Sequence, residues 1–225
     1  GVEVEYIDFT KKENISKISA YNPTLIWLES PTNPLLKVLN IKKICDEAKK
    51  QKIPVIVDNT FSTALIQKPL ELGATLSIIS TTKFINGHSD ALGGAVLTMN
   101  EGWNKKMLFA QKSLGLQPSP FDCWLITRGV KTLPLRIEQQ TKSADLISKE
   151  LENHKLISKL IYPFNPKHPQ FELAKSQMKL GGSMITINLN LNKQNTFKFC
   201  KSLKYFSLAE SLGGVESLIC HPATM

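Results

Sequence analysis

The stretch IPVIVD, residues 53–58, is a short run of mostly β-branched apolar side chains that ends in a carboxylate. A short, continuous apolar run is typical of a strand that is buried on both faces of a sheet. Residues 75–80 (TLSIIS) repeat this pattern, and residues 25–29 (LIWLE) and 93–98 (GGAVLT) are further candidates. We therefore predict a sheet that is built from these segments.

Helices are predicted between these segments. Asn40 can cap a helix over residues 41–51, whose apolar side chains recur at helical spacing on one face: Ile41, Ile44, Cys45 and Ala48. A short helical stretch is expected near residues 67–73. Strands that alternate with helices at this spacing are typical of βαβ units. The predicted fold class is therefore α/β, with a mostly parallel sheet.

The character of the chain changes to helix from about residue 119. A long amphipathic helix is predicted over residues 131–153, with these apolar side chains roughly on one face: Leu133, Ile137, Ala144, Ile147 and Leu151. Short strands and one helix follow it: strands at 156–162, 183–190 and 205–210, and a helix near 194–203. We expect a large domain of residues 1–130 and a smaller α+β domain of residues 131–225, joined by the long helix.

Size and cysteine content point to a cytosolic globular protein. The chain has 225 residues, of which 42% are apolar, so it can bury a sizeable core. No apolar run reaches the roughly 20 residues that a membrane helix needs, and no basic and apolar leader opens the chain. We expect a soluble, cytoplasmic protein. Four widely spaced cysteines, with no Cys/His cluster among them, predict reduced thiols: Cys45, Cys123, Cys200 and Cys220.

The formal net charge of +9 raises the question of nucleic-acid binding. All but two of the 28 basic residues are lysines, the exceptions being Arg128 and Arg136. Recognition of bases and phosphates depends on the planar guanidinium fork, which is nearly absent here. The lysines are also scattered rather than gathered in one stripe. We therefore expect a compositional bias and no nucleic-acid partner.

Polar residues follow two of the predicted strands. Asp58 ends one strand and Ser80 ends another, and ligands gather at the carboxyl ends of parallel strands. We expect the two side chains to face the same crevice. Ser80 and Thr82 alternate along the chain, so that their hydroxyls can bind one anion such as phosphate. Lys83 follows directly, and a lysine beside apolar strands loses its proton more easily and can attack a carbonyl.

An acid, an anion site and a nucleophilic amine are the three groups that pyridoxal phosphate requires. The acid keeps the ring nitrogen protonated, the lysine holds the aldehyde as a Schiff base, and the phosphate anchors the other end. Each residue alone has a plainer interpretation: Asp58 as a helix cap, Ser80 and Thr82 as turn formers, and Lys83 as a surface charge. Their joint placement at neighbouring strand ends favours the cofactor.

Other polar residues receive plainer roles. His88 follows the Asn86-Gly87 turn and is expected to satisfy hydrogen bonds of that loop, and the other three histidines have no partner at catalytic spacing. The glycine pairs at 93–94 and 213–214 do not have the pattern of a dinucleotide-binding loop. We expect no metal site.

Five segments resemble the signature blocks of the cystathionine γ-lyase/γ-synthase family, a group of fold-type I pyridoxal-phosphate enzymes of cysteine and methionine metabolism. They are ESPTNP (29–34), VDNTF (57–61), STTKFINGHSD (80–90), GLQPSPFDCWLITRGVKTLPLR (115–136) and LAESLGGVESLICHPATM (208–225). The segments occur in the family's order and spacing along the whole chain. The resemblance implies a pyridoxal-phosphate-binding large domain and a smaller C-terminal domain, both incomplete.

The resemblance also implies roles for the residues around the cofactor. Lys83 would form the Schiff base with pyridoxal 5'-phosphate and, once released, would move protons between substrate carbons. Asp58 would pair with the pyridine nitrogen, and Ser80 and Thr82 would bind the phosphate. Asn33 would contact the phenolic oxygen of the cofactor and lie near the substrate carboxylate.

Two more residues are implied in substrate binding. Ser211 matches a residue that lines the site of the substrate carboxylate. Glu210 matches an acidic residue that influences which carbon is attacked and which substrates fit.

Several blocks of the family pattern are not found in the 225 residues. The Gly-rich phosphate loop, the tyrosine that stacks on the cofactor and a Tyr/Arg arm from a neighbouring subunit belong upstream, and the arginine that binds the substrate carboxylate belongs downstream. We therefore interpret the chain as an internal fragment, weakly active or inert alone, of an active protein. The resemblance implies a homotetramer.

The favoured reaction is γ-elimination of cystathionine to cysteine, 2-oxobutanoate and ammonia, as in a cystathionine γ-lyase. This choice depends mainly on the segments NGHSD (86–90) and SLGLQPSPFDCWL (113–125). Cystathionine γ-synthase, methionine γ-lyase and homoserine sulfhydrylase remain alternatives. From other classes, an inactive paralogue that serves as an oligomer scaffold and a basic RNA-associated protein are the rival hypotheses, the second resting on charge alone.

Overall fold

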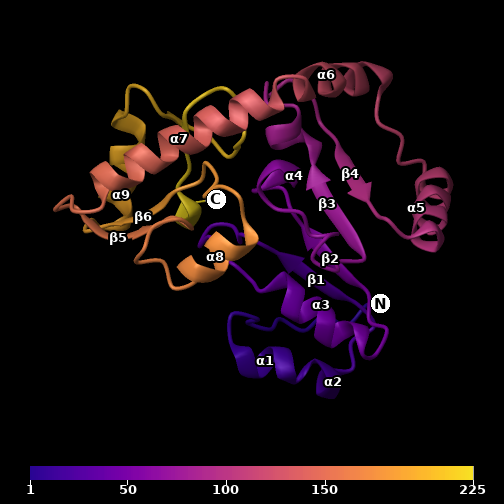
Figure 1. Ribbon diagram of the computed structural model, residues 1–225. Helices are drawn as coiled ribbons and strands as arrows, with labels where there is room; N and C mark the ends of the chain where they lie inside the picture. Colours follow the sequence, from indigo (N-terminus) through magenta and orange to yellow (C-terminus); the bar gives the residue numbers. More distant parts are fainter. Residues whose placement is uncertain (225) are drawn as a thin grey trace.

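The structure is a computed structural model that describes residues 1–224, and a four-stranded sheet lies at its centre (Figure 1). The strands are β1 (Ile26–Glu29), β2 (Val55–Asp58), β3 (Leu76–Ser80) and β4 (Gly94–Leu97), in this spatial order. Strands β1, β2 and β3 run parallel, whereas β4 runs antiparallel to β3. The predicted α/β class with a mostly parallel sheet is confirmed.

One face of the sheet is covered by helix α3 (Ile41–Lys49), with the short helices α1 (Lys12–Ser16) and α2 (Ile18–Tyr21) beyond it (Figure 1). The predicted cap is present, because Oδ1 of Asn40 accepts a hydrogen bond from the backbone N–H of Lys43 at 2.9 Å. The predicted apolar stripe of α3 is buried and packs against alternate residues of the strands: Ile26 and Leu28 of β1, and Val55 and Val57 of β2.

The helix predicted near residues 67–73 is wrong. The helix of this region is α4 (Thr63–Ile66), and residues 69–73 form tight turns. Gln67 is extended (φ −139°, ψ 139°) and ends α4, proline disfavours helical backbone at the preceding residue, Lys68, and Gly73 adopts a left-handed φ of 100° that ends the turns. Helix α5 (Glu101–Leu114), none of whose residues is buried, was not predicted.

The second half of the chain is mainly helical at first and then mixed. It contains α6 (Pro120–Val130), α7 (Leu133–Leu151), β5 (Ile157–Ile161), α8 (Phe171–Gln177), β6 (Thr186–Leu189), α9 (Lys193–Ser202), β7 (Ser207–Leu208), β8 (Leu218–Ile219) and the 3-10 turn η2 (Pro222–Thr224). Strands β5 and β6 pair antiparallel, and β7 and β8 form a separate parallel pair. Helix α8 was not predicted.

Helix α7 leads from the central sheet to the C-terminal elements (Figure 1). Its buried side chains include Leu133 and Ile137, which join a hydrophobic cluster with Phe84 from the first half of the chain and Met178 from the second. The two halves therefore share a core beside this helix, and the domain boundary at residue 130 stays a prediction. None of the helices within residues 1–224 has both the length and the apolar character of a bilayer span.

Candidate functional site

Thr60 connects the carboxyl ends of two neighbouring strands. Its backbone N–H donates to Oδ1 of Asp58, the last residue of β2, at 2.9 Å. Its hydroxyl accepts the backbone N–H of Ser80, the last residue of β3, at 2.9 Å. The structure thus brings Asp58 and Ser80 to one edge of the sheet. Thr60 was not singled out in the sequence, although it lies in the segment VDNTF.

A second carboxylate, Glu29, stands beside Asp58. The two residues are register partners at the ends of the parallel strands β1 and β2, so their side chains project from the same face of the sheet. Burial raises the pKa of Glu29, the backbone N–H of Asn33 acts in the opposite direction, and the charge of Asp58 raises the pKa further. Glu29 was not singled out in the sequence, because its pairing with Asp58 depends on the strand register.

Residues 81–87, called the Lys83 loop below, follow β3 without a break. The loop begins with the wide helical turn η1 (Thr81–Ile85), whose helical geometry is interrupted at Lys83 itself (φ −88°, ψ −124°). The backbone N–H of Asn86 donates to Thr81 O at 2.9 Å, and that of Gly87 donates to Lys83 O at 2.8 Å. Lys83 is half-buried, and within residues 1–224 its Nζ has neither an ion pair nor a hydrogen bond. The amine is therefore available to a ligand.

The two hydroxyls predicted to bind an anion have different surroundings. The Thr82 hydroxyl accepts the backbone N–H of Gly93 at 3.0 Å and donates to Gly93 O at 3.3 Å, so it fastens the loop to the start of β4. The Ser80 hydroxyl has no hydrogen-bond partner within the part of the chain that the structure describes. Ser80 is thus the hydroxyl of the pair that is left for a ligand.

The C-terminal segment reaches the same loop. Gly213 has a left-handed φ of 79°, and a Cβ built at this position would come within 2.6 Å of the backbone nitrogen of Phe84 and 2.9 Å of the carbonyl carbon of Lys83. Ser211, two residues earlier, is half-buried, whereas Glu210 is exposed. These two residues therefore lie in a segment that packs against the Lys83 loop.

Asn33 lies just beyond β1, and its side chain is exposed. Its backbone N–H donates a hydrogen bond to the carboxylate of Glu29, so Asn33 lies at the same edge of the sheet as Asp58. The predicted set thus gathers around one sheet edge and one loop.

The histidines lie apart from this constellation. His88 Nδ1 forms a hydrogen bond with Asn86 O at 2.8 Å, which confirms the predicted role within the loop. His168 is buried against Leu36 O, and His221 pairs with the Thr224 hydroxyl. Within the described residues no group of three His, Cys, Asp or Glu side chains is placed to hold a metal ion.

The chain matches, over residues 1–225, the family described as Cys/Met metabolism PLP-dependent enzyme, and it belongs to that family. It is 40% identical over its whole length to the cystathionine beta-lyase of Coxiella burnetii and 42% identical to the cystathionine gamma-lyase of Dictyostelium discoideum. It spans 58% of the length of each of these relatives.

Solved structures of the family have the same fold. A cystathionine gamma synthase from Xanthomonas oryzae in complex with cystathionine superimposes with a TM-score of 0.94 at 40% identity, over 97% of this chain and 56% of that one. CalE6, a methionine gamma lyase from Micromonospora echinospora, gives a TM-score of 0.96 at 35% identity, over 100% of this chain and 61% of that one. The predicted fold-type I architecture is confirmed.

The family implies pyridoxal 5'-phosphate, and the residues present fit this cofactor. Oδ2 of Asp58 has no partner within residues 1–224 and can accept the N–H of a protonated ring nitrogen. The Ser80 hydroxyl can donate to a phosphate oxygen, and the Lys83 amine can bind an aldehyde carbon. The donor set therefore supplies one group for each end of the cofactor and one for its reactive carbon.

We expect Glu29→Gln to change how stability depends on pH. Because the pKa of Glu29 is raised above its ordinary value of 4.5, the folded protein binds this proton more tightly than the unfolded chain does. The contribution of Glu29 to stability is therefore fully present below pH 4.5 and is lost as pH rises through the folded-state pKa. The neutral glutamine variant should melt at a higher temperature than the parent at pH 7, with the gain shrinking on acidification.

Thermal melts of the parent and variant between pH 4 and pH 8 measure this effect. Glu138→Gln, at an exposed position of α7, is the matched control and should change the melting temperature little at any pH. An equal shift for Glu29→Gln at every pH would contradict the assignment.

Proposed function

We propose that the whole protein is a transsulfuration enzyme that uses pyridoxal phosphate to cleave the γ-carbon–sulfur bond of cystathionine. The observation that carries the proposal is the juxtaposition of Asp58 and Ser80 through Thr60, with the Lys83 amine, which pairs with no described residue, three positions beyond Ser80. When bound, the cofactor supplies an electron-withdrawing ring that accepts the electrons left on the substrate's α-carbon.

Lys83 is proposed to do two things. Its Nζ would hold the cofactor covalently and, when free, would carry protons between the substrate's carbons. Lys83 is half-buried and its Nζ pairs with no carboxylate within residues 1–224, so the amine is open to a ligand, which suits both tasks.

Asp58 and Ser80 are proposed to orient the cofactor. The carboxylate of Asp58 accepts the ring N–H and so keeps a positive charge at the far end of the ring, and the Ser80 hydroxyl donates to the phosphate. Thr82 is proposed to assist at the phosphate by fastening the loop to Gly93, since its own hydroxyl is engaged there. Asn33 is proposed to contact the phenolic oxygen.

The substrate is proposed to lie between the Lys83 loop and the C-terminal segment. Ser211 and Asn33 approach the substrate carboxylate, and Glu210 influences which carbon reacts. The backbone contact of Gly213 with residues 83 and 84 supports this arrangement, because it places the segment that carries Ser211 against the Lys83 loop.

The particular reaction is proposed to be γ-elimination. Cystathionine and one water give cysteine, 2-oxobutanoate and ammonia, so the γ-carbon–sulfur bond breaks and the α-amino group leaves as ammonia. The names of relatives support this choice, since cystathionine gamma-lyases of Dictyostelium discoideum, Rattus norvegicus and Bacillus subtilis are 41–42% identical. Other relatives are named cystathionine gamma-synthase and cystathionine beta-lyase, so γ-replacement and β-cleavage are the competing reactions.

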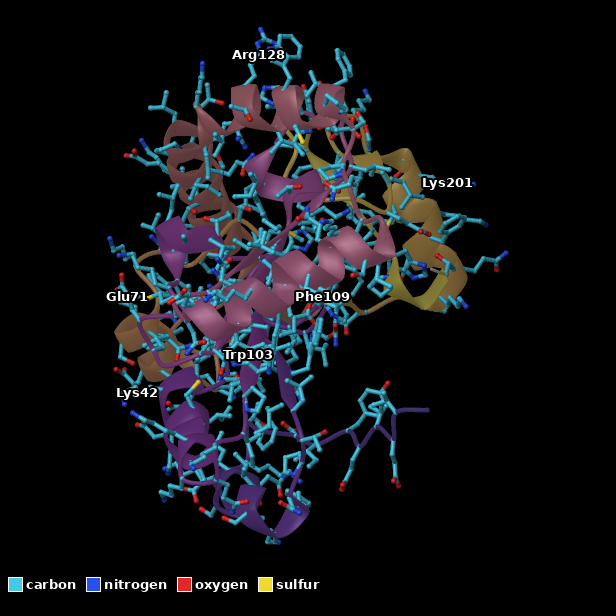
Figure 2. The ribbon with its side chains drawn as sticks, turned by 90° about the vertical axis from the view of Figure 1, so that its right-hand side faces the viewer. Lys42, Glu71, Trp103, Phe109, Arg128 and Lys201 are labelled. Atoms are coloured by element: carbon cyan, nitrogen blue, oxygen red, sulfur yellow. The ribbon has the colours of Figure 1, made fainter. Side chains whose placement is uncertain are left out.

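The protein is also proposed to be a cytoplasmic homo-oligomer. Large apolar side chains are exposed along α5 and α6, among them Phe109 (72%), Phe121 (65%) and Trp124 (58%), and Figure 2 shows Phe109 on the face turned to the viewer. Such a patch is typical of a protein–protein interface. Light scattering of the whole protein should give a tetramer, and a monomer at micromolar concentration would contradict the proposal.

Reduction with borohydride tests the role of Lys83. The whole protein with pyridoxal phosphate should be yellow, and reduction should bleach it and leave a pyridoxyl group on the peptide that contains Lys83. Lys83→Ala should lose this adduct and about 10²–10⁴-fold of the activity, because both the covalent attachment and the proton transfer depend on the amine. Lys112→Ala, at an exposed position of α5, is the matched control and should keep both. An adduct on another lysine in the parent protein would contradict the assignment.

Product analysis tests the reaction itself. Incubation of the whole protein with cystathionine should release 2-oxobutanoate and cysteine in equal amounts, and the Lys83→Ala variant should release neither above background. Release of pyruvate and homocysteine would instead show β-cleavage. Consumption of O-succinylhomoserine only when cysteine is present would show γ-replacement, and either result would overturn the γ-lyase proposal.

A further inference from the structure

Arg136, in the first turn of α7, donates side-chain hydrogen bonds to the backbone of the Lys83 loop. Its Nη1 donates to Phe84 O at 2.8 Å, and its Nη2 donates to Ile85 O at 3.2 Å. These are the two carbonyls that follow Lys83 directly in the chain. One side chain thus fixes the backbone immediately beyond the proposed reactive lysine, across more than 50 residues of sequence.

The same guanidinium is anchored to α6 and to the start of α7. Nη2 also donates to Gly129 O at 2.9 Å, and Nε donates to the Thr132 hydroxyl at 3.1 Å. All four acceptors are neutral, and within residues 1–224 no carboxylate lies within ion-pair distance of Arg136. Partial burial lowers the pKa of Arg136, because it removes water from around the charge. The neutral hydrogen-bond acceptors take the place of that water and of a counter-ion.

Two glycines allow the close approach that these hydrogen bonds need. Gly87, with a φ of 72°, lies against the guanidinium, and a Cβ at this position would clash with Nη1 of Arg136. A Cβ at Gly129 would likewise clash with Asn86 O. The backbone of the loop therefore lies directly against the end of α6 at Gly129 and against the guanidinium of Arg136.

A lysine cannot reproduce this set of contacts. The guanidinium is planar and presents its N–H groups in a rigid fork, which here reaches three carbonyls and one hydroxyl at once. An ammonium group at the end of a flexible stem would meet only part of the set. The structure thus explains why one of the two arginines in a lysine-rich chain stands at this position.

We propose that Arg136 is a positioning residue for Lys83. By fixing the carbonyls of Phe84 and Ile85, it fixes the point from which the Lys83 side chain leaves the backbone, and so the distance from Nζ to the cofactor's aldehyde carbon. The inference rests on the proposed function, since it needs Lys83 to be the attachment point. A small displacement of a reacting group from its productive geometry is enough to lower a reaction rate markedly.

The experiment compares Arg136→Lys and Arg136→Met with Arg128→Lys and Arg128→Met in the whole protein. Arg128 is the other arginine of the chain, is exposed, and projects outward from α6 in Figure 2. Thr132→Val, which removes the acceptor of Nε together with the hydroxyl's own hydrogen bond to Gly129 O, leaves the Nη1 and Nη2 contacts in place; it is a milder third variant and keeps the test open if Arg136→Met does not fold.

Two measurements separate positioning from general stability. The first is the rate at which added pyridoxal phosphate forms a borohydride-reducible adduct on Lys83. The second is the hydrogen exchange of the amides of Asn86 and Gly87, which are hydrogen-bonded within the loop. We expect Arg136→Lys to slow adduct formation about tenfold and to speed exchange at these two amides, with circular dichroism unchanged. Thr132→Val should have the same effects at smaller size, and the Arg128 variants should match the parent.

The outcomes distinguish the two proposals. If the parent protein and the Arg128 variants form the adduct on Lys83 and Arg136→Lys forms it equally fast, the positioning role is overturned and the role of Lys83 stands. If the parent protein forms no adduct on Lys83, the proposed function fails, and the positioning role fails with it.

Discussion

The hydrogen bonds of Thr60 are the interaction on which the site depends. One residue receives the N–H of Ser80 through its hydroxyl and gives its own N–H to Asp58. The ends of β2 and β3 are thereby held in one arrangement, with the acid and the unpartnered hydroxyl at the same sheet edge. Parallel pairing of the strands alone brings the strand ends together, and Thr60 fixes the side chain of Asp58 relative to the backbone of Ser80.

The loop that follows β3 is held from several directions. Thr82 fastens it to the start of β4, Arg136 fastens it to α6 and α7, and Gly213 lies on the backbone of residues 83 and 84. Segments that are far apart in sequence therefore meet around Lys83, whose own amine pairs with no group of residues 1–224. A rigid backbone that carries one free nucleophilic side chain is the arrangement that preorganised catalysis requires.

The elements that bury regular apolar patterns could be predicted from the sequence. The continuous β-branched runs predicted strands β2 and β3. The stripe of four apolar residues, together with the Asn40 cap, predicted helix α3. Helix α5 was missed although Trp103, Met107, Ala110 and Leu114 recur at helical spacing. The helix placed at residues 67–73 overlooked that the backbone is extended at Gln67, two residues before Pro69. The antiparallel direction of β4 also leaves no mark on a short apolar run.

The same limit applies to the site. Asp58, Ser80, Thr82 and Lys83 could be proposed because each follows a predicted strand closely. The placement of Glu29 beside Asp58 depends on the strand register. The hydrogen bonds of Arg136 to the Lys83 loop depend on how α7 packs on a segment some 50 residues earlier. Such contacts are tertiary and leave no local pattern in one sequence.

A crystal structure of the whole protein grown with pyridoxal phosphate tests the central claim most directly. We expect continuous electron density from Nζ of Lys83 to the cofactor, with the ring nitrogen at hydrogen-bond distance from Asp58 and a phosphate oxygen at the same distance from the Ser80 hydroxyl. A cofactor attached to a different lysine, or a ring that faces away from Asp58, would contradict it.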